Sequence, residues 1–378
     1  MIPRRLFLAL AGAASLSACG AAPTLAPRRP AAAADDLRPV PNPAYDAWVR
    51  AFRPRAEAAG ITPATLNAAF RGAGFIPGVV TRDRSQPETS YTLEDYLQIA
   101  ASDDRVAKGR AAFARHRGTL DALERRYGVP AEIICAIWGL ESQYGEKRGT
   151  VPVISATSTL AFDGRRGAFF EKQLIAALRI LQAGDVTPAR MVGSWAGAMG
   201  HTQFIPTSYL AYAVDFTGDG KRDIWSDDPT DALASTAAYL AKSGWARGLK
   251  WGGETGQPGT PAGSSLTPQA GGPSFTVTSN FAVIKRYNNS DLYAIGIGHL
   301  SDRLAGGGPI RGAFPPDANG LTLAERQRLQ TGLTAKGYDT GGTSGVIGPK
   351  SRAAISAYQK DMGLPVTGTP SPALLARL

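Results

Sequence analysis

Residues 131–145 read AEIICAIWGLESQYG, an apolar run that ends in a carboxylate, polar residues and a glycine. Apolar side chains fill most positions before Glu141, so a helix over 131–142 is expected to be buried in a core. Pro130 suits the first turn of such a helix, and Gly145 ends it. Burial against apolar neighbours raises the pKa of a carboxyl group, as general acid catalysis near neutral pH requires. Glu141 is therefore a candidate general acid, although a solvated glutamate at a helix end would show the same pattern.

Two further stretches carry side chains suited to a ligand site. Residues 193–209 read GSWAGAMGHTQFIPTSY, in which small residues let the backbone approach a ligand closely. Trp195 and Phe204 could pack on sugar rings and Gln203 could hydrogen-bond an amide or a hydroxyl, but the pattern also suits a tight helix crossing with core aromatics. Residues 286–293 read RYNNSDLY, which indicates either a polar cleft lined by tyrosine and asparagine or an ordinary helix start capped by Asn or Ser.

The composition is that of a soluble chain with a packed core, because 43% of the 378 residues are hydrophobic and 19% are charged. The formal charge of +10 favours acidic polymers such as nucleic acid, anionic lipid or cell wall. Only two cysteines and three histidines occur, which argues against a Cys/His enzyme or a zinc finger. Cys135 lies in an apolar stretch and is predicted to be a small core residue.

The N-terminus has the pattern of an export signal. Two arginines precede an apolar run over 6–16 that is too short to span a membrane as a mature helix. The run ends in LSAC, which resembles a bacterial lipobox with Cys19 as the lipidated first residue; the alternative is an ordinary signal peptide. We expect a signal peptide over 1–18 and a flexible Ala/Pro-rich tether over 19–43. Gly20 is not the aspartate that usually retains lipoproteins in the inner membrane, so the periplasmic face of the outer membrane is favoured.

Hydrophobic periodicity predicts a chain built mainly of helices. Thr92 followed by Asp95 indicates a helix start. Further helices are predicted over 105–127, 169–183, 188–194, 207–214 and 230–243. The alternation over 275–286 favours a strand. The Gly/Pro-rich residues 252–273 and 305–320 indicate a long surface loop and a domain boundary.

Three motifs occur in one order: E-S-x-Y-G at 141–145, S-W-A-G-A-M-G-x-x-Q-F-x-P-x-S-Y at 194–209 and R-Y-N-x-S-x-x-Y at 286–293. Together they resemble the lytic murein transglycosylase B family over residues 44–303. The resemblance implies a mainly α (α+β) fold with a lysozyme-like catalytic domain over 44–312. It also implies an enzyme that cleaves the glycosidic bond between N-acetylmuramic acid and N-acetylglucosamine in peptidoglycan.

The resemblance further implies roles for particular residues. The family's catalytic glutamate falls on Glu141. Its substrate-binding residues fall on Ser194, Gln203, Tyr287, Asn288 and Tyr293. In this family one glutamate protonates the leaving oxygen and then takes the proton from the muramoyl O6, which closes on C1 without water. No cofactor is required, and the partners implied are glycan strands and, through the lipid, a membrane, with a monomeric enzyme. The export signal and the lack of a Lys/Arg block argue against nucleic acid as a partner.

Two other functions stay open on the sequence. A lysozyme-type hydrolase would use water and a second carboxylate, for which Asp163 and Glu171 are the nearest candidates, although nothing in their spacing singles them out. A non-catalytic wall-binding lipoprotein would keep the fold and lack activity. Glu141 argues against it, because Gln or Ala at that position would have supported it.

Residues 215–223 read DFTGDGKRD, which fits the start of a calcium loop. Its oxygen ligands would include Asp215, Thr217 and Asp219. Position 12 is Ser226 rather than the usual bidentate glutamate. Family members that bind calcium close the loop with a later aspartate, which aligns here with Asp231, but the additional residues 226–228 depart from that pattern. The sequence therefore favours a metal-free Asx-turn loop over a structural calcium site, with little or no effect of calcium on stability.

The final residues, 313–378, resemble a small helical peptidoglycan-binding module. The matching residues include Gly337-Tyr338, Gly345-Val346-Ile347-Gly348 and Tyr358-Gln359. Ser344 stands where the module usually has aspartate. The module would hold the enzyme on the wall and raise the local substrate concentration; the alternative is a structural appendix.

Overall fold

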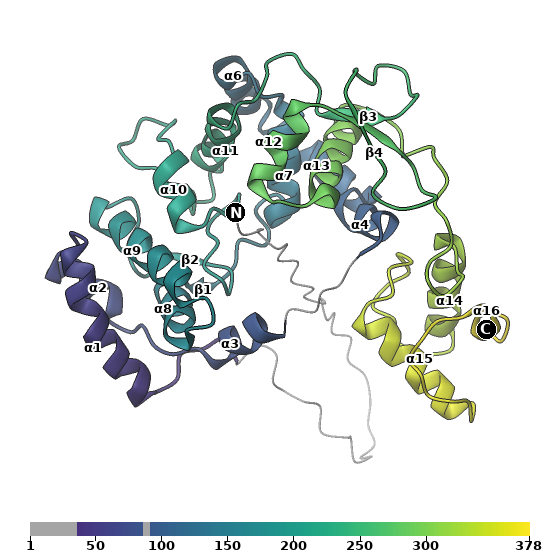
Figure 1. Cartoon of the computed structure of the whole chain (residues 1–378), viewed down its shortest axis with the longest axis horizontal. Helices are drawn as coiled ribbons and strands as arrows, with labels where there is room; N and C mark the ends of the chain where they lie inside the picture. The colour runs from purple at the N-terminus through teal and green to yellow at the C-terminus, as the bar shows by residue number, and fades with distance from the viewer. Residues whose placement is uncertain (1–35, 86–90) are drawn as a thin grey trace, which may run out of the picture. The chain divides into compact units, whose positions relative to one another are not determined.

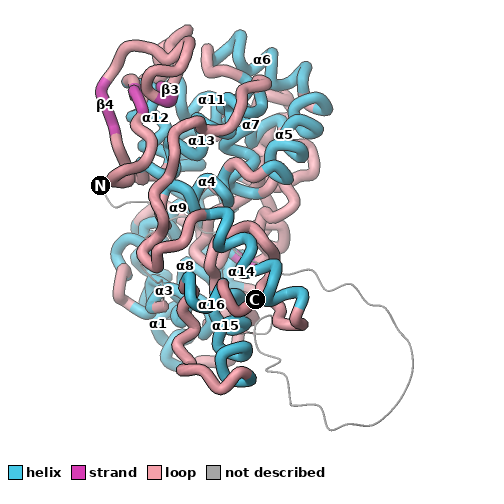
Figure 2. Tube along the Cα trace, turned by 90° about the vertical axis from the view of Figure 1, so that its right-hand side faces the viewer, coloured by secondary structure: helices cyan, strands magenta, loops and turns pink. Residues whose placement is uncertain are grey.

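The computed structural model describes residues 36–85 and 91–378, so the expected signal peptide, Cys19 and residues 20–35 of the expected tether lie outside it. The described residues form helices joined by loops, with a few short strands (Figure 2), which confirms the mainly α fold. They divide into a Glu141 unit (residues 36–85 and 108–247) and a C-terminal unit (residues 91–107 and 248–378). None of the described helices is both long and apolar enough to cross a membrane.

Helices make up most of the Glu141 unit (Figure 1). They are α1 (Pro43–Ala58), α2 (Pro63–Phe70), α3 (Pro77–Arg84), α5 (Asp103–Arg115, which begins in the other unit), α6 (Arg117–Tyr127), α7 (Ala131–Ser142), α8 (Val153–Asp163), α9 (Gly167–Ala183), α10 (Pro206–Tyr212) and α11 (Thr230–Lys242). Two short strands, β1 (Val151–Pro152) and β2 (Val192–Gly193), pair antiparallel. α8 packs along α9, and α7 packs against α6 and α11. One core cluster, which includes Val79, Leu160 and Phe170, joins α3, α8 and α9.

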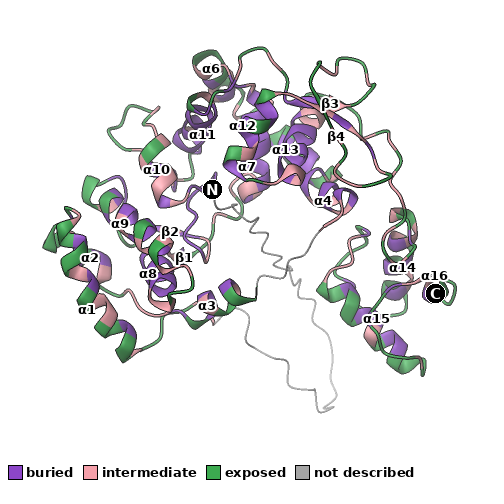
Figure 3. Ribbon diagram, in the orientation of Figure 1, coloured by how far each residue is buried: buried purple, intermediate pink, exposed green. Residues whose placement is uncertain are grey.

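The C-terminal unit combines helices with a small antiparallel sheet. Its helices are α4 (Leu93–Ala100), α12 (Ser279–Tyr287), α13 (Asp291–Leu304), α14 (Leu323–Ala335), α15 (Pro349–Asp361) and α16 (Pro372–Leu375). The strands β3 (Gly252–Glu254), β4 (Ser264–Leu266) and β5 (Phe275–Val277) form a sheet in the order β3-β5-β4. α13 is largely buried (Figure 3) and packs against α4 and α12. A Cβ at Gly298 would lie 2.2 Å from the Trp251 ring, so this glycine permits close packing on α13.

The helices α14, α15 and α16 surround their own core, which includes Leu329, Ile355 and Tyr358. Arg326 on α14 is 2% exposed, yet its guanidinium reaches α4. It donates to Glu94 at 2.7 Å and to Asp95 at 3.0 Å. Since both carboxylates come from α4, the small C-terminal helices are joined to that helix by a buried ion cluster.

Several sequence predictions were confirmed and others were wrong. The helix over 131–142 and the cap at Thr92 are as predicted, and residue 116 divides the predicted helix 105–127 into two. The predicted strand 275–286 was wrong after Val277, because the hydroxyl of Thr278 caps a new helix by accepting the N–H of Asn280. No helix forms over 188–194, where β2 lies, and the expected loop 252–273 contains β3 and β4.

Helix α8 was not predicted from the sequence. Its residues from Val153 to Ala161 are all buried, so it lacks the polar face that gives a helix its period (Figure 3). Its threonines and serines look like loop residues in the sequence. In the structure their hydroxyls bond back to the helix: Thr157 donates to the Val153 carbonyl at 2.7 Å and Ser158 to the Ile154 carbonyl at 2.6 Å.

Residues 36–42, the last part of the expected tether, contact the Glu141 unit. Asp36 pairs with Arg82 at 2.6 Å, and Val40 donates its N–H to the carbonyl of Phe75 at 2.8 Å. These contacts fix the approach to α1, whose first turn is capped by the side chain of Asn42.

Candidate active site

The last turn of α7 presents Glu141, which is half-buried, and an unusual backbone follows it. Gln143 and Tyr144 adopt left-handed conformations with φ of 52° and 58°, and Gly145 follows with φ of 91°. Left-handed backbone costs a non-glycine residue free energy and persists only where the surroundings hold it, commonly at functional sites. The turn after Glu141 is therefore held in place by its neighbours.

The glycine-rich residues 193–204 form a tight loop closed by backbone pairing rather than a helix crossing. A Cβ at Gly193 would lie 2.1 Å from the carbonyl oxygen of Ala198, so no larger residue fits this approach. The hydroxyl of Ser194 accepts the N–H of Ala198 at 3.0 Å. Ser194 thus stabilises the turn that it begins, and it remains partly accessible.

Gln203 lies at the end of this loop with a left-handed backbone, φ 54°. Its side-chain nitrogen donates to the carbonyl oxygens of Arg148 at 3.0 Å and Gly200 at 2.8 Å. These bonds use the amide N–H groups of Gln203, and its side-chain oxygen can act only as an acceptor.

The first two motifs are in direct contact within the Glu141 unit. Ser142, the residue after Glu141, donates its hydroxyl to the backbone carbonyl of His201 at 2.5 Å. The indole N–H of Trp138 donates to Nδ1 of His201 at 3.1 Å. The fold therefore brings the end of α7 together with the loop over 193–204, although the two segments are far apart in sequence.

The third motif lies in the C-terminal unit, where α12 ends and α13 begins. Tyr287 is the last residue of α12, Asn288 follows it, and Tyr293 lies in the first turn of α13; all three are buried. The hydroxyl of Ser290 accepts the N–H of Tyr293 at 3.3 Å, so the predicted helix cap is present. Packing and the cap fix these residues within their own unit.

Other reactive side chains are occupied elsewhere in the fold. Glu171 binds Arg55 through both oxygens, at 2.8 and 2.9 Å, and Asp163 binds Arg84 at 2.5 Å. Both carboxylates therefore have a structural role as ion-pair partners. Cys135 is buried, as predicted, and burial raises the pKa of its thiol to about 12, so the thiol stays protonated and unreactive.

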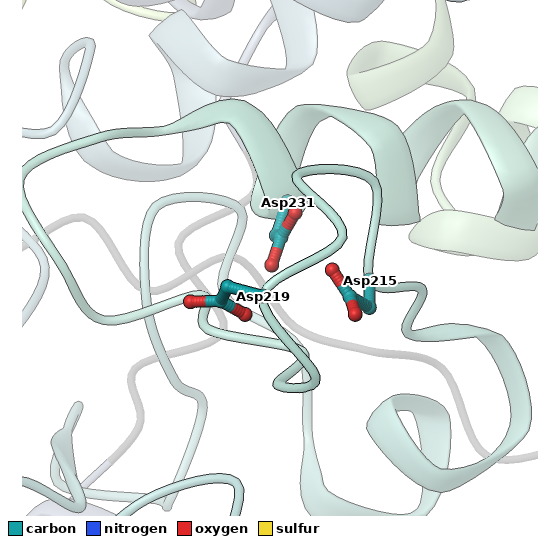
Figure 4. Close-up of side chains that lie close together, drawn as sticks. All are labelled: Asp215, Asp219 and Asp231. Atoms are coloured by element: carbon teal, nitrogen blue, oxygen red, sulfur yellow. The ribbon is translucent and has the colours of Figure 1, made fainter.

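Three carboxylates converge in the acidic loop that follows α10 (Figure 4). Oxygens of Asp215, Asp219 and Asp231 lie within 4.8 Å of one another. Asp231 closes the loop in spite of the additional residues 226–228, because its two oxygens accept three backbone N–H groups of the loop at 2.9 to 3.1 Å. Thr217 donates its hydroxyl to Asp215 at 3.3 Å. Oxygen-only donors with concentrated negative charge suit a hard divalent cation.

His201 and Arg148 lie where the first two motifs meet, and neither was predicted from the sequence. His201 occupies an unspecified position of the second motif, and Arg148 lies outside all three motifs. The guanidinium of Arg148 donates to the carbonyl of Ser226 at 2.7 Å. No local pattern reveals such roles, because the partners of each residue come from distant parts of the chain.

Comparison with known proteins identifies the class to which this fold and site belong. The family model described as the transglycosylase SLT domain matches residues 44–265 and 253–302. A model of a peptidoglycan binding domain matches residues 322–378. The chain belongs to the transglycosylase SLT family, and it is a lytic transglycosylase that acts on peptidoglycan and carries a peptidoglycan-binding domain.

Individual relatives agree with this class. SltB3 from Pseudomonas aeruginosa, solved in complex with NAG-anhNAM-pentapeptide, is 44% identical with a TM-score of 0.70; the match covers 89% of this chain and 99% of SltB3. The membrane-bound lytic murein transglycosylase B of Escherichia coli (strain K12) is 33% identical over 244 residues, which are 56% of this chain and 66% of that protein. The Escherichia coli lytic transglycosylase Slt35 in complex with calcium is 29% identical with a TM-score of 0.58, over 70% of this chain and 93% of Slt35.

Proposed function

We propose that Glu141 is the single acid and base of this lytic transglycosylase, which cleaves the MurNAc–GlcNAc β-1,4 bond and leaves 1,6-anhydro-MurNAc ends. The observation that carries the proposal is the contact between the end of α7, which carries Glu141, and the loop over 193–204. The alternative carboxylates Asp163 and Glu171 are held by arginines, which disfavours a hydrolase with a second carboxylate. SltB3 has been solved with both NAG-NAM-pentapeptide and NAG-anhNAM-pentapeptide.

The reaction balances with one glutamate. Protonated Glu141 donates its proton to the glycosidic oxygen, the bond from C1 to that oxygen breaks, and the GlcNAc unit leaves with a free 4-hydroxyl. The acetamide of MurNAc stabilises the positive charge that develops at C1. The Glu141 carboxylate then takes the proton from O6 while O6 bonds to C1. Glu141 ends protonated and no water is consumed; intramolecular attack has a large entropic advantage over capture of a free water.

The remaining motif residues would hold the sugar in the distorted form that brings O6 to C1. We assign Gln203 to accept a hydrogen bond from an N–H or hydroxyl of the glycan, because its amide nitrogen is already committed to two carbonyls. We assign positioning of the saccharide also to Ser194, Tyr287, Asn288 and Tyr293.

The test is the chemistry of the new ends. Digestion of peptidoglycan in heavy-oxygen water should give muropeptides that end in 1,6-anhydromuramic acid, without the label and resistant to borohydride. Glu141→Gln should abolish this cleavage with an unchanged circular dichroism spectrum. Labelled reducing ends would show a hydrolase, and normal turnover by the Gln variant would remove Glu141 from the mechanism.

We further propose that the enzyme is lipid-anchored through Cys19 at the periplasmic face of the outer membrane. Support comes from the LSAC sequence that ends at Cys19 and from the name of the membrane-bound Escherichia coli relative. Cys19→Ser should give a protein that is released from membranes by a high-salt wash. Equal retention of the variant and the wild type would exclude the lipid as the anchor.

We also propose a structural calcium ion at Asp215, Asp219 and Asp231, with Thr217 beside them, which the chemistry does not require. The support is the convergence of the three carboxylates and the calcium complex of Slt35. Calcium should raise the Tm of the wild type and have no such effect on Asp219→Ala. A wild-type Tm that is the same in calcium and in chelator would show a metal-free loop, as the sequence alone favours.

A further inference from the structure

His201 bonds through both its backbone and its ring to the residues beside Glu141. Its carbonyl oxygen accepts the hydroxyl of Ser142 at 2.5 Å, and its Nδ1 accepts the indole N–H of Trp138 at 3.1 Å. On the other side, its Nε2 lies 2.7 Å from the carbonyl oxygen of Ser226. Trp138 precedes Glu141 by about one helical turn and Ser142 follows it directly, so His201 holds both flanks of the acid.

These partners fix the protonation state of the His201 ring. An indole N–H can only donate, so Nδ1 must present its lone pair to Trp138. Nε2 faces two groups, the carbonyl oxygen of Ser226 at 2.7 Å and Nη1 of Arg148 at 3.3 Å. The carbonyl is much nearer and can only accept, so Nε2 carries a proton that it donates to Ser226, and the longer approach of Arg148 is not a hydrogen bond to this tautomer. The ring is therefore the neutral tautomer protonated at Nε2, and it is 3% exposed. A second proton on Nδ1 would face the indole N–H and break that bond.

Arg148 binds the same carbonyl and also orients Gln203. Its Nη1 donates to the carbonyls of Ser226 at 2.7 Å and Trp225 at 2.9 Å. Its own backbone carbonyl accepts the side-chain N–H of Gln203 at 3.0 Å. The pair between Arg148 and Asp227 adds little, because the Asp227 side chain is 97% exposed. Arg148 thus links Gln203 to the backbone of Trp225 and Ser226, and the Ser226 carbonyl also binds His201.

We propose that His201 and Arg148 are positioning residues for the transglycosylase reaction: neutral His201 fixes the turn that carries Glu141, and Arg148 fixes Gln203. The inference rests on the proposed role of Glu141 and deepens it. Neither residue has to touch the glycan. Their contribution is large because a catalytic group displaced by about 1 Å can lose on the order of 100-fold in rate.

Protonation of His201 should make kcat fall on the acid side of the pH profile, separately from any titration of Glu141. Burial lowers the pKa of His201, the charges of Arg148 and His116 lower it further, and the Ser226 carbonyl and Asp227 oppose them. The neutral ring therefore persists below the ordinary histidine pKa of about 6.5. As the pH falls through the lowered pKa, the bond to Trp138 is lost and kcat should fall with it.

Steady-state kinetics of the full chain on soluble glycan fragments, measured across acid and neutral pH, test the proposal. His201→Phe and Trp138→Phe should each lower kcat about 10- to 100-fold with KM changed less than about twofold. The double variant should lose little more, because both substitutions remove the same bond. His201→Asn keeps an acceptor for Trp138 and does not titrate, so it should retain most of kcat and lose the acid limb that depends on His201.

His299→Asn is the matched control, because His299 is buried in the C-terminal unit and burial lowers its pKa to about 4. This variant should keep the wild-type kcat and the same fall of kcat at acid pH that we assign to His201. Glu141→Gln is assayed in parallel: if it is active, the proposed function itself fails. If it is inactive while His201→Phe and Trp138→Phe turn over normally, only the positioning role is overturned. If His201→Phe does not fold, His201→Asn decides. A fall of its kcat at acid pH that matches that of the wild type would overturn the positioning role of His201.

Discussion

Gly145 closes the turn after Glu141, and its lack of a side chain is required twice. Its φ of 91° disfavours other residues, and a Cβ there would lie 2.6 Å from Nδ1 of His201. Gly184, which ends α9, has a φ of 82° but no atom within 4 Å of an added Cβ. The two glycines therefore separate the cost of backbone strain from the cost of a contact with His201.

Gly184→Ala should lower the free energy of unfolding by about 1–2 kcal/mol, from strain alone, and leave kcat unchanged. Gly145→Ala should lower it by more and also lower kcat, because His201 must shift away from Trp138. Thermal unfolding and turnover of soluble glycan measure the two effects. Equal losses of stability with equal, wild-type kcat values would show that the contact with His201 is unimportant.

The sequence could reveal the residues that we propose for catalysis and substrate binding, but not those that we propose to position them. Glu141, Ser194 and Gln203 stand in recognisable motifs, and the first two motifs meet in the fold as expected for one site. The hydrogen-bond partners of the His201 ring and the Arg148 side chain, among them Trp138 and Ser226, lie 25 or more positions away in the sequence. Only the folded chain brings such partners together.

At the scale of elements, prediction succeeded where one local signal dominated. α7 was predicted correctly because an apolar run lies between two clear boundary residues, Pro130 before it and Gly145 after it. α8 was missed because a helix buried on all sides has no amphipathic period. The strand assigned to 275–286 ended after Val277, since alternation over a few residues cannot be distinguished from one side of a short helix.

Asp302 on α13 carries a largely buried carboxyl group whose titration should affect stability. Burial raises the pKa of Asp302 from 3.8 to about 6, although the Trp251 indole, at 3.1 Å, and Lys250 act to lower it. A raised pKa means that the folded state favours the protonated carboxyl, so the stabilising contribution is complete below pH 3.8 and lost as the pH rises through about 6. Asp302→Asn keeps an acceptor for Trp251 without the charge. It should raise the Tm at pH 7 by roughly 2–4 °C.

The gain from Asp302→Asn should shrink as the pH falls from 7 to 4, and calorimetry at several pH values measures it. Asp339→Asn is the control of opposite sign, because the Gly341 N–H and Lys350 lower the pKa of that exposed carboxyl. It should not stabilise the protein at pH 7. A Tm gain from Asp302→Asn that is constant with pH would refute the titration of Asp302 as its cause.

At the scale of the molecule, the C-terminal helices are fastened to α4 as well as joined to the preceding chain. Arg326 pairs with Glu94 and Asp95 on α4, and its Nη1 lies 3.7 Å from Asp317. The segment that precedes the module is also held, because Glu254 accepts the N–H groups of Arg311 and Gly312. The boundary predicted from Gly and Pro residues over 305–320 is therefore tied to the sheet rather than a simple linker.

This fastening predicts how the wall-binding domain contributes to cleavage. Arg326→Met would leave the buried Glu94 and the partly buried Asp95 without their cation, and breaking a buried pair costs about 3–5 kcal/mol. The module should detach from α4 while its own core persists, so proteases should cut within 305–321 much faster than in the wild type. Cleavage of insoluble peptidoglycan should fall several-fold, because the wall-binding module is no longer fixed to α4, whereas turnover of soluble fragments should be kept.

Adding Glu94→Gln and Asp95→Asn to Arg326→Met removes the buried negative charge and serves as the control. The triple variant should recover much of the lost stability, since neutral side chains no longer need a cation. It should still cleave insoluble peptidoglycan slowly, because the bond from α14 to α4 remains absent. If Arg326→Met instead shows wild-type protease resistance and wild-type cleavage of intact walls, the ion cluster does not position the binding domain. The domain would then act only by raising the local concentration of glycan, for which any attachment to the chain suffices.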